Sequence, residues 1–272
     1  MTQTAFITGA TSGIGAECAR QLAATGWDLV LLARDGERLA RVADRLAGRY
    51  GVTVSILSAD LTTEAGLAAA CGRLSDEVAP IELLVNSAGF GLAGRFHRNR
   101  VADEEQMLDL LVRAPLRLTH AAMRGMLSRG SGRIVNVASV AGFVPRGTYS
   151  AAKAWLITFC RSLNAVYGPR GVHVTALCPG FVRTEFHERM GDEMAGIPRW
   201  MWLTTEPVVR RGLRDSARGR SISVPTVRYR AIVALTRVLP SALLAERGRG
   251  SRMGEARPVS RHGANSACDA LT

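Results

Sequence analysis

Thr4-Ala5-Phe6-Ile7-Thr8-Gly9-Ala10-Thr11-Ser12-Gly13-Ile14-Gly15 predicts a strand, a glycine turn and a helix, in that order. The first five residues form a short run with apolar and β-branched side chains, typical of a buried strand. Glycines in the turn let the backbone bend tightly and approach a pyrophosphate, and the following helix, about 14–25, would point free N–H groups at the negative charge. The turn reads G-x-x-x-G-x-G rather than G-x-G-x-x-G. The structural alternative is an ordinary strand–helix turn.

Apolar runs and helical patterns alternate along the rest of the chain. The expected strands are 28–33, 52–57, 81–85, 133–138, 172–177 and 221–224. The expected helices begin near 37 and cover about 63–78, 102–128 with a kink at Pro115, 149–167, 207–217 and 229–238. Such alternation predicts an α/β fold with a doubly wound parallel sheet in three α/β/α layers. We expect one domain over residues 1–245.

Several distinctive residues follow directly after predicted strands. The glycine turn, Asn86, Ser139 and Pro179-Gly180 all lie at strand ends. Because ligands of doubly wound sheets bind beyond the carboxyl ends of the strands, we expect these residues to share one crevice. The second strand ends in Ala33-Arg34, and an arginine there suits the extra phosphate of NADP, whereas an acid suits NAD. We therefore expect NADP(H) as the preferred cofactor, with NAD(H) as the alternative, and Asp35 as the cap of the next helix.

Tyr149 and Lys153 are four residues apart in a predicted helix, which places them on one face. Lys153 is the only lysine among 35 basic residues. A compact ammonium differs from a planar guanidinium, and it would lower the pKa of Tyr149 from its usual ~10 toward neutrality. Such a pair can exchange a proton with a substrate oxygen. The structural alternative is a solvated helix pair.

Composition narrows the class of protein. The chain has 272 residues, is 47% apolar and carries a net charge of +12. Its five cysteines are spread widely without metal-ligand spacing, so we expect reduced thiols, no metal site and a cytoplasmic location. The first strand leaves no room for a signal peptide, and no apolar run reaches about 18 residues, so no transmembrane helix is expected.

The positive charge is concentrated in residues 207–272, which hold 13 arginines against four acidic residues. Nucleic acid or an anionic membrane would suit such a surface. No helix-turn-helix, zinc or RNA-binding signature accompanies it, so we favour a solvated surface and no nucleic-acid partner. Residues 246–272 lack periodicity and aromatic side chains, and we expect a disordered basic tail.

Residues 184–204 combine turn residues with large apolar side chains, namely Phe186, Met190, Met194, Trp200, Met201 and Trp202. We interpret them as an apolar lid over a fairly hydrophobic substrate. The alternative is simple packing of a connecting loop.

With these motifs the chain resembles the short-chain dehydrogenase/reductase family, built as one Rossmann-like domain, over about residues 4–240. The resemblance rests on Thr8-Gly9-x-x-x-Gly13-x-Gly15, Asp60, Asn86-x-Ala88-Gly89, Ser139, Tyr149-x-x-x-Lys153 and Pro179-Gly180 with Thr184. It implies hydride transfer between a nicotinamide cofactor and a small-molecule carbonyl/alcohol pair. In that role Tyr149 would be the general acid/base, Ser139 would hydrogen-bond the substrate oxygen, and Lys153 would lower the tyrosine pKa and hold the nicotinamide ribose.

The resemblance also implies a cofactor-binding set and an assembly. Asp60 would lie at the adenine, Asn86 near the ribose and Thr184 at the carboxamide. The full expected set is Gly9, Thr11, Ser12, Gly13, Ile14, Gly15, Arg34, Asp60, Leu61, Asn86, Ala88, Gly89, Tyr149, Lys153, Pro179, Gly180, Val182 and Thr184. A homo-oligomer, dimer or tetramer, would form through the Tyr149 helix and the last strand.

The sequence departs from the family at Leu111, where an asparagine usually anchors a water in the proton relay from the lysine. A leucine side chain cannot do so, and the relay would then need backbone carbonyls. Ser87 replaces a commoner asparagine, and the glycine turn has Ser12 where many NADP-binding members carry a basic residue. Two other hypotheses stay open: a nucleotide-binding sensor or scaffold with little turnover, and a peripheral membrane enzyme that uses the arginine-rich residues 207–262 and the stretch 231–244.

Overall fold

The computed structural model describes residues 2–94, 96–185 and 197–236. Within these ranges the chain forms a seven-stranded sheet in the order β3-β2-β1-β4-β5-β6-β7, and every neighbouring pair is parallel. The strands are β1 (Thr4–Thr8), β2 (Asp28–Ala33), β3 (Val54–Ser58), β4 (Leu83–Asn86), β5 (Gly132–Val137), β6 (Val172–Leu177) and β7 (Ile222–Ser223). The strand order reverses between β1 and β4, which is where such sheets open a ligand crevice.

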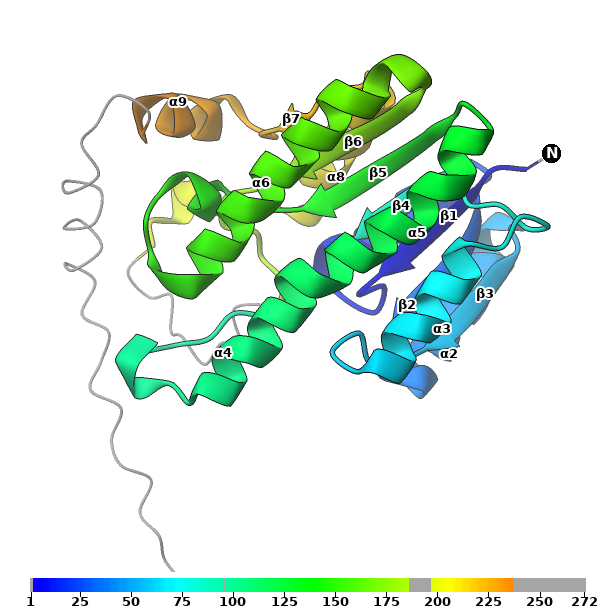
Figure 1. The fold of residues 1–272 in the computed structure, drawn as a ribbon, viewed down its shortest axis with the longest axis horizontal. Helices are drawn as coiled ribbons and strands as arrows, with labels where there is room; N and C mark the ends of the chain where they lie inside the picture. The colour runs from blue at the N-terminus through cyan, green and yellow to red at the C-terminus, as the bar shows by residue number, and fades with distance from the viewer. Residues whose placement is uncertain (1, 95, 186–196, 237–272) are drawn as a thin grey trace, which may run out of the picture.

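Helices cover both faces of the sheet, which confirms the predicted three-layer α/β/α fold (Figure 1). One face carries α3 (Glu64–Leu74), α5 (Ala114–Ser128) and α6 (Gly147–Tyr167), and the other carries α1 (Gly13–Ala23), α2 (Gly36–Tyr50) and α8 (Thr205–Ala217). Successive residues of β1 alternate between the two cores: Phe6 packs on the α5 side, while Ala5 and Ile7 pack on the α1 side. This alternation follows from the two-residue period of a strand that is buried on both faces.

Most predicted boundaries are correct to within two residues, and the differences have local causes. The third strand begins at Val54, because the N–H of Thr53 donates to the Asp28 carboxylate at 2.8 Å. Helix α3 ends at Leu74, four residues early, because the Asp76 carboxylate accepts from the N–H of Val78 and closes a turn. The predicted cap is confirmed: the Asp35 side chain accepts from the N–H of Arg38 at the start of α2.

The helix predicted over 102–128 is interrupted. Its two parts, α4 (Val101–Leu108) and α5, are joined by one π-helical turn, η2 (Asp109–Arg113), in which Ala114 N–H donates to the carbonyl of Asp109, five residues back. Pro115 has no N–H and cannot donate the next bond of that register, so the carbonyl of Leu110 loses its π-helical partner. The expected proline kink therefore takes the form of a π turn just before the proline.

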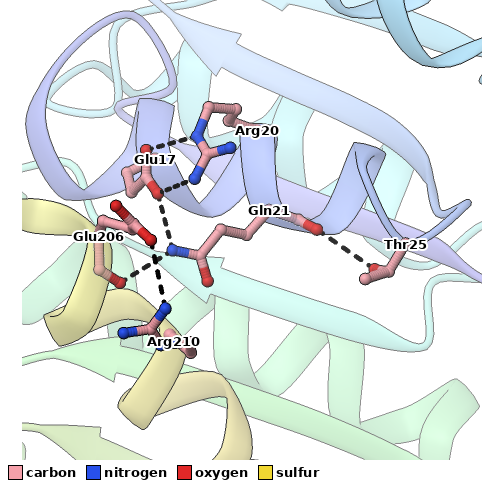
Figure 2. A network of polar contacts seen from close by, with 6 residues as sticks. All are labelled: Glu17, Arg20, Gln21, Thr25, Glu206 and Arg210. Carbon is pink, nitrogen blue, oxygen red and sulfur yellow. Dashed lines mark hydrogen bonds and ion pairs between the residues drawn. The ribbon is translucent and has the colours of Figure 1, made fainter.

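A polar network fastens α1, the helix after the glycine turn, to α8 (Figure 2). The Glu17 carboxylate accepts hydrogen bonds from Arg20 and Gln21. Gln21 Nε2 also donates to the main-chain oxygen of Glu206 at 2.9 Å, and the Glu206 side chain pairs with Arg210. The start of α8 is thus held against the helix that begins at the glycine turn.

Candidate active site

The glycine turn between β1 and α1 has a backbone that requires glycine at three points. Gly9 and Gly13 have φ of 67° and 55°, in the left-handed region that favours glycine, and a Cβ on Gly15 would overlap the carbonyl of Gly9. Ser12 stands at the N-cap of α1, but its side chain accepts no hydrogen bond from the helix. The turn therefore presents helix N–H groups without a side-chain cap, as a pyrophosphate site requires.

Asn86, the last residue of β4, is 5% exposed and lies beside this turn. Its Nδ2 donates to Oδ1 of Asn136 at 2.8 Å, whereas its own Oδ1 is buried without a hydrogen-bond partner among the described residues. A buried acceptor of this kind is costly unless something donates to it. The hydroxyl groups of a nucleotide ribose would suit this atom, so the residues present fit a dinucleotide.

Ala88 and Gly89 are held close to the glycine turn. The Thr8 hydroxyl accepts hydrogen bonds from the N–H groups of Ser87 and Ala88, both at 3.0 Å. A Cβ on Gly9 would come within 2.9 Å of the Ala88 backbone. The ends of β1 and β4 thus lie side by side and form one side of the crevice.

The predicted catalytic residues lie together next to these strand ends; they are Ser139, Tyr149 and Lys153. Ser139 follows β5, and its Oγ accepts from the N–H of Ala141 at 3.1 Å, which caps the short helix η3 (Val140–Phe143). Tyr149, in the first turn of α6, is hydrogen-bonded to Ser139. Lys153 Nζ lies 5.6 Å from the centroid of the Tyr149 ring. The predicted spacing on one helical face therefore brings the three side chains into one group.

Lys153 is 5% exposed, and its ammonium donates to the carbonyl of Val137 at 2.7 Å. Burial lowers the pKa of Lys153 to about 8. The lysine is therefore a cation near neutral pH that can lose its charge in mildly alkaline solution.

The expectation that Lys153 lowers the pKa of Tyr149 is wrong for this structure. Burial raises the pKa of Tyr149 to about 12, and the hydrogen bond with Ser139 opposes that rise. The ammonium lies over the ring and bonds to the Val137 carbonyl, so it gives the phenol oxygen little charge stabilisation. Desolvation of the phenolate is the larger effect.

Leu111 lies in the π turn and is 1% exposed. It packs with Met107 and Ala152, and Tyr149 and Phe90 border this apolar cluster. Its Cδ2 would lie 2.9 Å from a Cβ on Gly89, so the leucine fills the space above that glycine. The Leu111 side chain is therefore an apolar packing group beside the tyrosine.

Arg34 follows β2 and its side chain is 69% exposed. One guanidinium nitrogen lies 4.0 Å from the carboxylate of Asp60. Asp60 also accepts from the N–H and hydroxyl of Thr62, at 2.9 and 2.8 Å. The structure thus brings the expected adenine-side residues together, with Arg34 held by one long, exposed contact.

Residues 179–184 pass over the other side of the crevice. The carbonyl of Pro179 accepts from Val140 N–H at 3.0 Å, which links this segment to the helix after Ser139. Thr184 reaches the glycine turn, where its methyl carbon would lie 3.1 Å from a Cβ on Gly13. Gly180 is covered by the ring of Tyr229.

The remaining expected cofactor residues occupy less direct positions. Thr11 and Ile14 are partly exposed in the glycine turn. Leu61 and Val182 have buried apolar side chains, so they could reach a dinucleotide only through their main chains.

Three features of the structure were not predicted from the sequence. Asn136 is a fully buried amide that links Asn86 to the Cys160 thiol, and a polar residue inside an apolar strand was a signal for it. An ion pair joins Arg38 of α2 to Glu185 across 147 positions, which no local pattern could indicate. Tyr229 lies outside every motif.

The described ranges contain no group of metal-ligating side chains and no helix that could cross a membrane. Four described cysteines, Cys18, Cys71, Cys160 and Cys178, are free thiols. Of the expected lid, residues 184–185 and 197–204 are described; Phe186, Met190 and Met194, like the tail 246–272, lie outside the described residues. A pocket between α8, β7 and α9 (Val227–Thr236) contains none of the expected site residues, so we place the site where the polar groups converge.

Comparison with known proteins agrees with this geometry. The sequence pattern of the family described as short chain dehydrogenase matches residues 3–195. The 3-oxoacyl-(acyl-carrier-protein) reductase of Aquifex aeolicus is 34% identical over 192 residues, which cover 70% of this chain and 77% of that protein.

Solved structures extend the similarity to nearly the whole chain. A short-chain dehydrogenase from Sphingobium yanoikuyae in complex with NADPH has a TM-score of 0.79 at 34% identity, covering 96% of this chain and 100% of that one. A bulky-bulky ketone specific alcohol dehydrogenase from Comamonas testosteroni has a TM-score of 0.75 at 30% identity, covering 96% and 98%. The parallel sheet, the glycine turn and the serine–tyrosine–lysine group agree with these matches. This chain therefore belongs to the short-chain dehydrogenase/reductase family of oxidoreductases, which interconvert alcohols and carbonyls with a nicotinamide cofactor.

Proposed function

We propose that this protein is an NADP(H)-dependent oxidoreductase that interconverts a carbonyl and an alcohol on a fairly hydrophobic substrate. The observation that carries the proposal is the grouping of Ser139, Tyr149 and Lys153 beside the unpartnered Oδ1 of Asn86, at the end of the sheet where the glycine turn opens. These residues are the proposed catalytic and ribose-side groups.

The proposed chemistry follows from the protonation states. When bound, the reduced nicotinamide supplies a hydride to the carbonyl carbon. Tyr149 gives its hydroxyl proton to the carbonyl oxygen, and Ser139 donates a hydrogen bond to the same oxygen. Because burial raises the pKa of Tyr149 to about 12, the phenol keeps its proton at neutral pH and is ready to act as an acid. Lys153, a cation below about pH 8, would hold the hydroxyl groups of the nicotinamide ribose.

Proton resupply is proposed to run through the main chain at the π turn. Leu111 is packed in the apolar cluster and offers no polar atom. In the register of the π turn, the donor to the Leu110 carbonyl would be the N–H that Pro115 lacks, so we propose that this carbonyl accepts a hydrogen bond from water instead. The relay would then need no asparagine side chain.

The cofactor preference rests on Arg34. Ala33, at the end of β2, has no carboxylate that would repel a phosphate. The Arg34 guanidinium is mostly exposed, so a 2′-phosphate could form a charge-assisted pair with it. The complex of the Sphingobium relative with NADPH supports this assignment.

An apolar substrate is supported by the surroundings of Tyr149. Phe90, Leu92 and Val112, like Tyr149, pack against the apolar cluster that contains Leu111. The similarity to an alcohol dehydrogenase specific for bulky ketones points the same way. We also propose a cytoplasmic location and a dimer or tetramer that forms through α6 and the last strand. Sedimentation should give a multiple of 29.1 kDa, and a monomer would contradict the assembly.

The test is a titration with NADPH and NADH, followed by a panel of aldehydes and ketones of increasing bulk, read as loss of nicotinamide absorbance. We expect NADPH to bind more tightly and bulky ketones to be reduced. Tight NADPH binding without turnover on any carbonyl would favour the sensor hypothesis instead. Equal affinity for both cofactors would contradict the role of Arg34.

A further inference from the structure

Residues 181–183 and 201–203 are paired with each other, and we call this pair the loop neck. Residues 181–183 run beside residues 201–203, with a parallel bridge between Val182 and Leu203. Leu203 N–H donates to the carbonyl of Phe181 at 2.8 Å, and Arg183 N–H donates to the carbonyl of Leu203 at 2.9 Å. The rings of Phe181 and Trp202 lie 5.9 Å apart. Both ends of the loop are therefore joined at one place.

Tyr229 of α9 bonds to both strands of this neck through one oxygen atom. Its hydroxyl donates to the carbonyl of Met201 at 2.8 Å and accepts from the N–H of Phe181 at 3.1 Å. The side chain is 2% exposed, and removing its hydroxyl would take this partner from both main-chain groups at once. The tyrosine thus braces the two segments of the neck, residues 181–183 and 201–203, against each other.

The ring of Tyr229 is fitted as closely as its hydroxyl. It covers the Cα of Gly180, where a methyl group would overlap the ring. Next to it, Arg228 donates to the carbonyls of Trp200 and Trp202, the latter at 3.2 Å. Two consecutive residues of α9 therefore hold residues 180–181 and 200–202 in register.

We propose that Tyr229, assisted by Arg228, is a positioning residue for the nicotinamide half of the cofactor. It fixes Pro179-Gly180-Phe181 and the loop neck, and so sets where the main chain between Pro179 and Thr184 meets the carboxamide. This inference rests on the proposed function. It assigns a role to α9, which lies beyond the residues 3–195 that the family pattern matches.

The two halves of the cofactor allow a sharp test. Tyr229→Phe keeps the ring on Gly180 and removes the bridging oxygen. We expect the dissociation constant of NADPH to rise about tenfold, because two partly buried main-chain groups lose their partner and the neck loosens. The affinity for 2′,5′-ADP, which has the adenine half and no nicotinamide, should stay within about twofold. Fluorescence and calorimetric titrations measure both.

Tyr50→Phe is the matched control. Tyr50 ends α2, and its hydroxyl bonds to Arg20, away from the loop neck. It should change neither affinity. If Tyr229→Phe does not fold, Arg228→Gln tests the same brace and should also weaken NADPH selectively.

The outcomes separate the two ideas. The inference is overturned if the variant binds NADPH like the parent protein, or if both ligands weaken equally. If the parent protein itself binds neither NADPH nor 2′,5′-ADP, the proposed function fails, and the role of Tyr229 fails with it.

Discussion

In the proposed function, the choice between NADPH and NADH depends on the side chain of Arg34. A charge-assisted pair with the 2′-phosphate contributes about 1.5–3 kcal/mol, or roughly 10- to 100-fold in affinity. Arg34→Ala should therefore raise the dissociation constant for NADPH by that factor and leave NADH nearly unchanged. Glu37→Ala is a suitable control, because it removes an exposed side chain in the first turn of α2, close in sequence to Arg34. If NADPH and NADH weaken to the same extent, Arg34 does not recognise the phosphate.

Lys153 should make cofactor binding depend on pH. Its pKa is about 8, so the ammonium is present below that pH and is lost above it. Because the cofactor is an anion, its affinity should be constant between about pH 6.5 and 7.5 and fall at higher pH. The dissociation constant of NADPH should rise about tenfold from pH 7 to 9.5, since one charge-assisted contact is lost.

The control for this titration is Lys153→Met, which carries no charge in the range. It should bind NADPH weakly with a flat pH profile. A parent protein with an equally flat profile would show that the lysine does not titrate next to the cofactor.

For individual side chains, the sequence predicted which residues lie together, but it did not predict their pKa values. The i, i+4 spacing was enough to place Tyr149 and Lys153 together. The direction of the tyrosine pKa depended on how deeply the phenol is buried and on where the ammonium points, and neither can be taken from spacing. Tyr229 was missed for a related reason, because its partners are main-chain groups that no sequence motif marks.

Among the elements, the π turn between α4 and α5 carries Leu111, one of the positions where this sequence departs from the family pattern. If water at the Leu110 carbonyl resupplies protons, a polar side chain at position 111 is not needed. Leu111→Asn should then leave turnover within about threefold and destabilise the fold by about 1–3 kcal/mol, because it buries an amide in an apolar cluster. Urea unfolding and steady-state kinetics measure both quantities.

Two results would change this interpretation. A large increase in turnover for Leu111→Asn would mean that the relay limits the parent enzyme. An inactive parent protein that stays inactive with asparagine would support the sensor hypothesis.

The elements themselves were predictable where local chemistry dominates. Strand β1, the glycine turn and the Asp35 cap follow from apolar runs, glycine and a capping carboxylate. The interruption of the long helix was expected only as a kink, because Pro115 indicates a missing donor but not how the preceding turn rearranges. The two-residue strand β7 is set by tertiary contacts with β6.

Across the whole molecule, Asp215 holds the end of the sheet to α8. It is 2% exposed and accepts from Arg211 Nε at 2.9 Å and from the Ser223 hydroxyl at 2.8 Å. Burial would raise the pKa of Asp215, but these hydrogen bonds outweigh it and hold the pKa below its usual value. Asp215→Ala should lower the free energy of unfolding by about 2 kcal/mol, since Ser223 stays buried without its partner.

The control lies in the same helix. Glu206 and Arg210, drawn in Figure 2, have the same i, i+4 spacing as Arg211 and Asp215. Both side chains of the Glu206–Arg210 pair are 59% exposed. Glu206→Gln should change the unfolding free energy by less than about 0.5 kcal/mol. Equal effects of the two substitutions would show that burial does not decide the contribution of these pairs.

The central claim is that Tyr149 delivers the proton that completes carbonyl reduction. The most direct measurement follows deuteride from NADPH deuterated at its transferring carbon into the alcohol of a bulky ketone, for the parent protein and for Tyr149→Phe. The parent protein should yield labelled alcohol. The variant should bind NADPH with unchanged affinity and transfer the label about 10²- to 10⁴-fold more slowly, as expected for loss of a general acid. Label transfer at the parent rate by Tyr149→Phe would contradict the account.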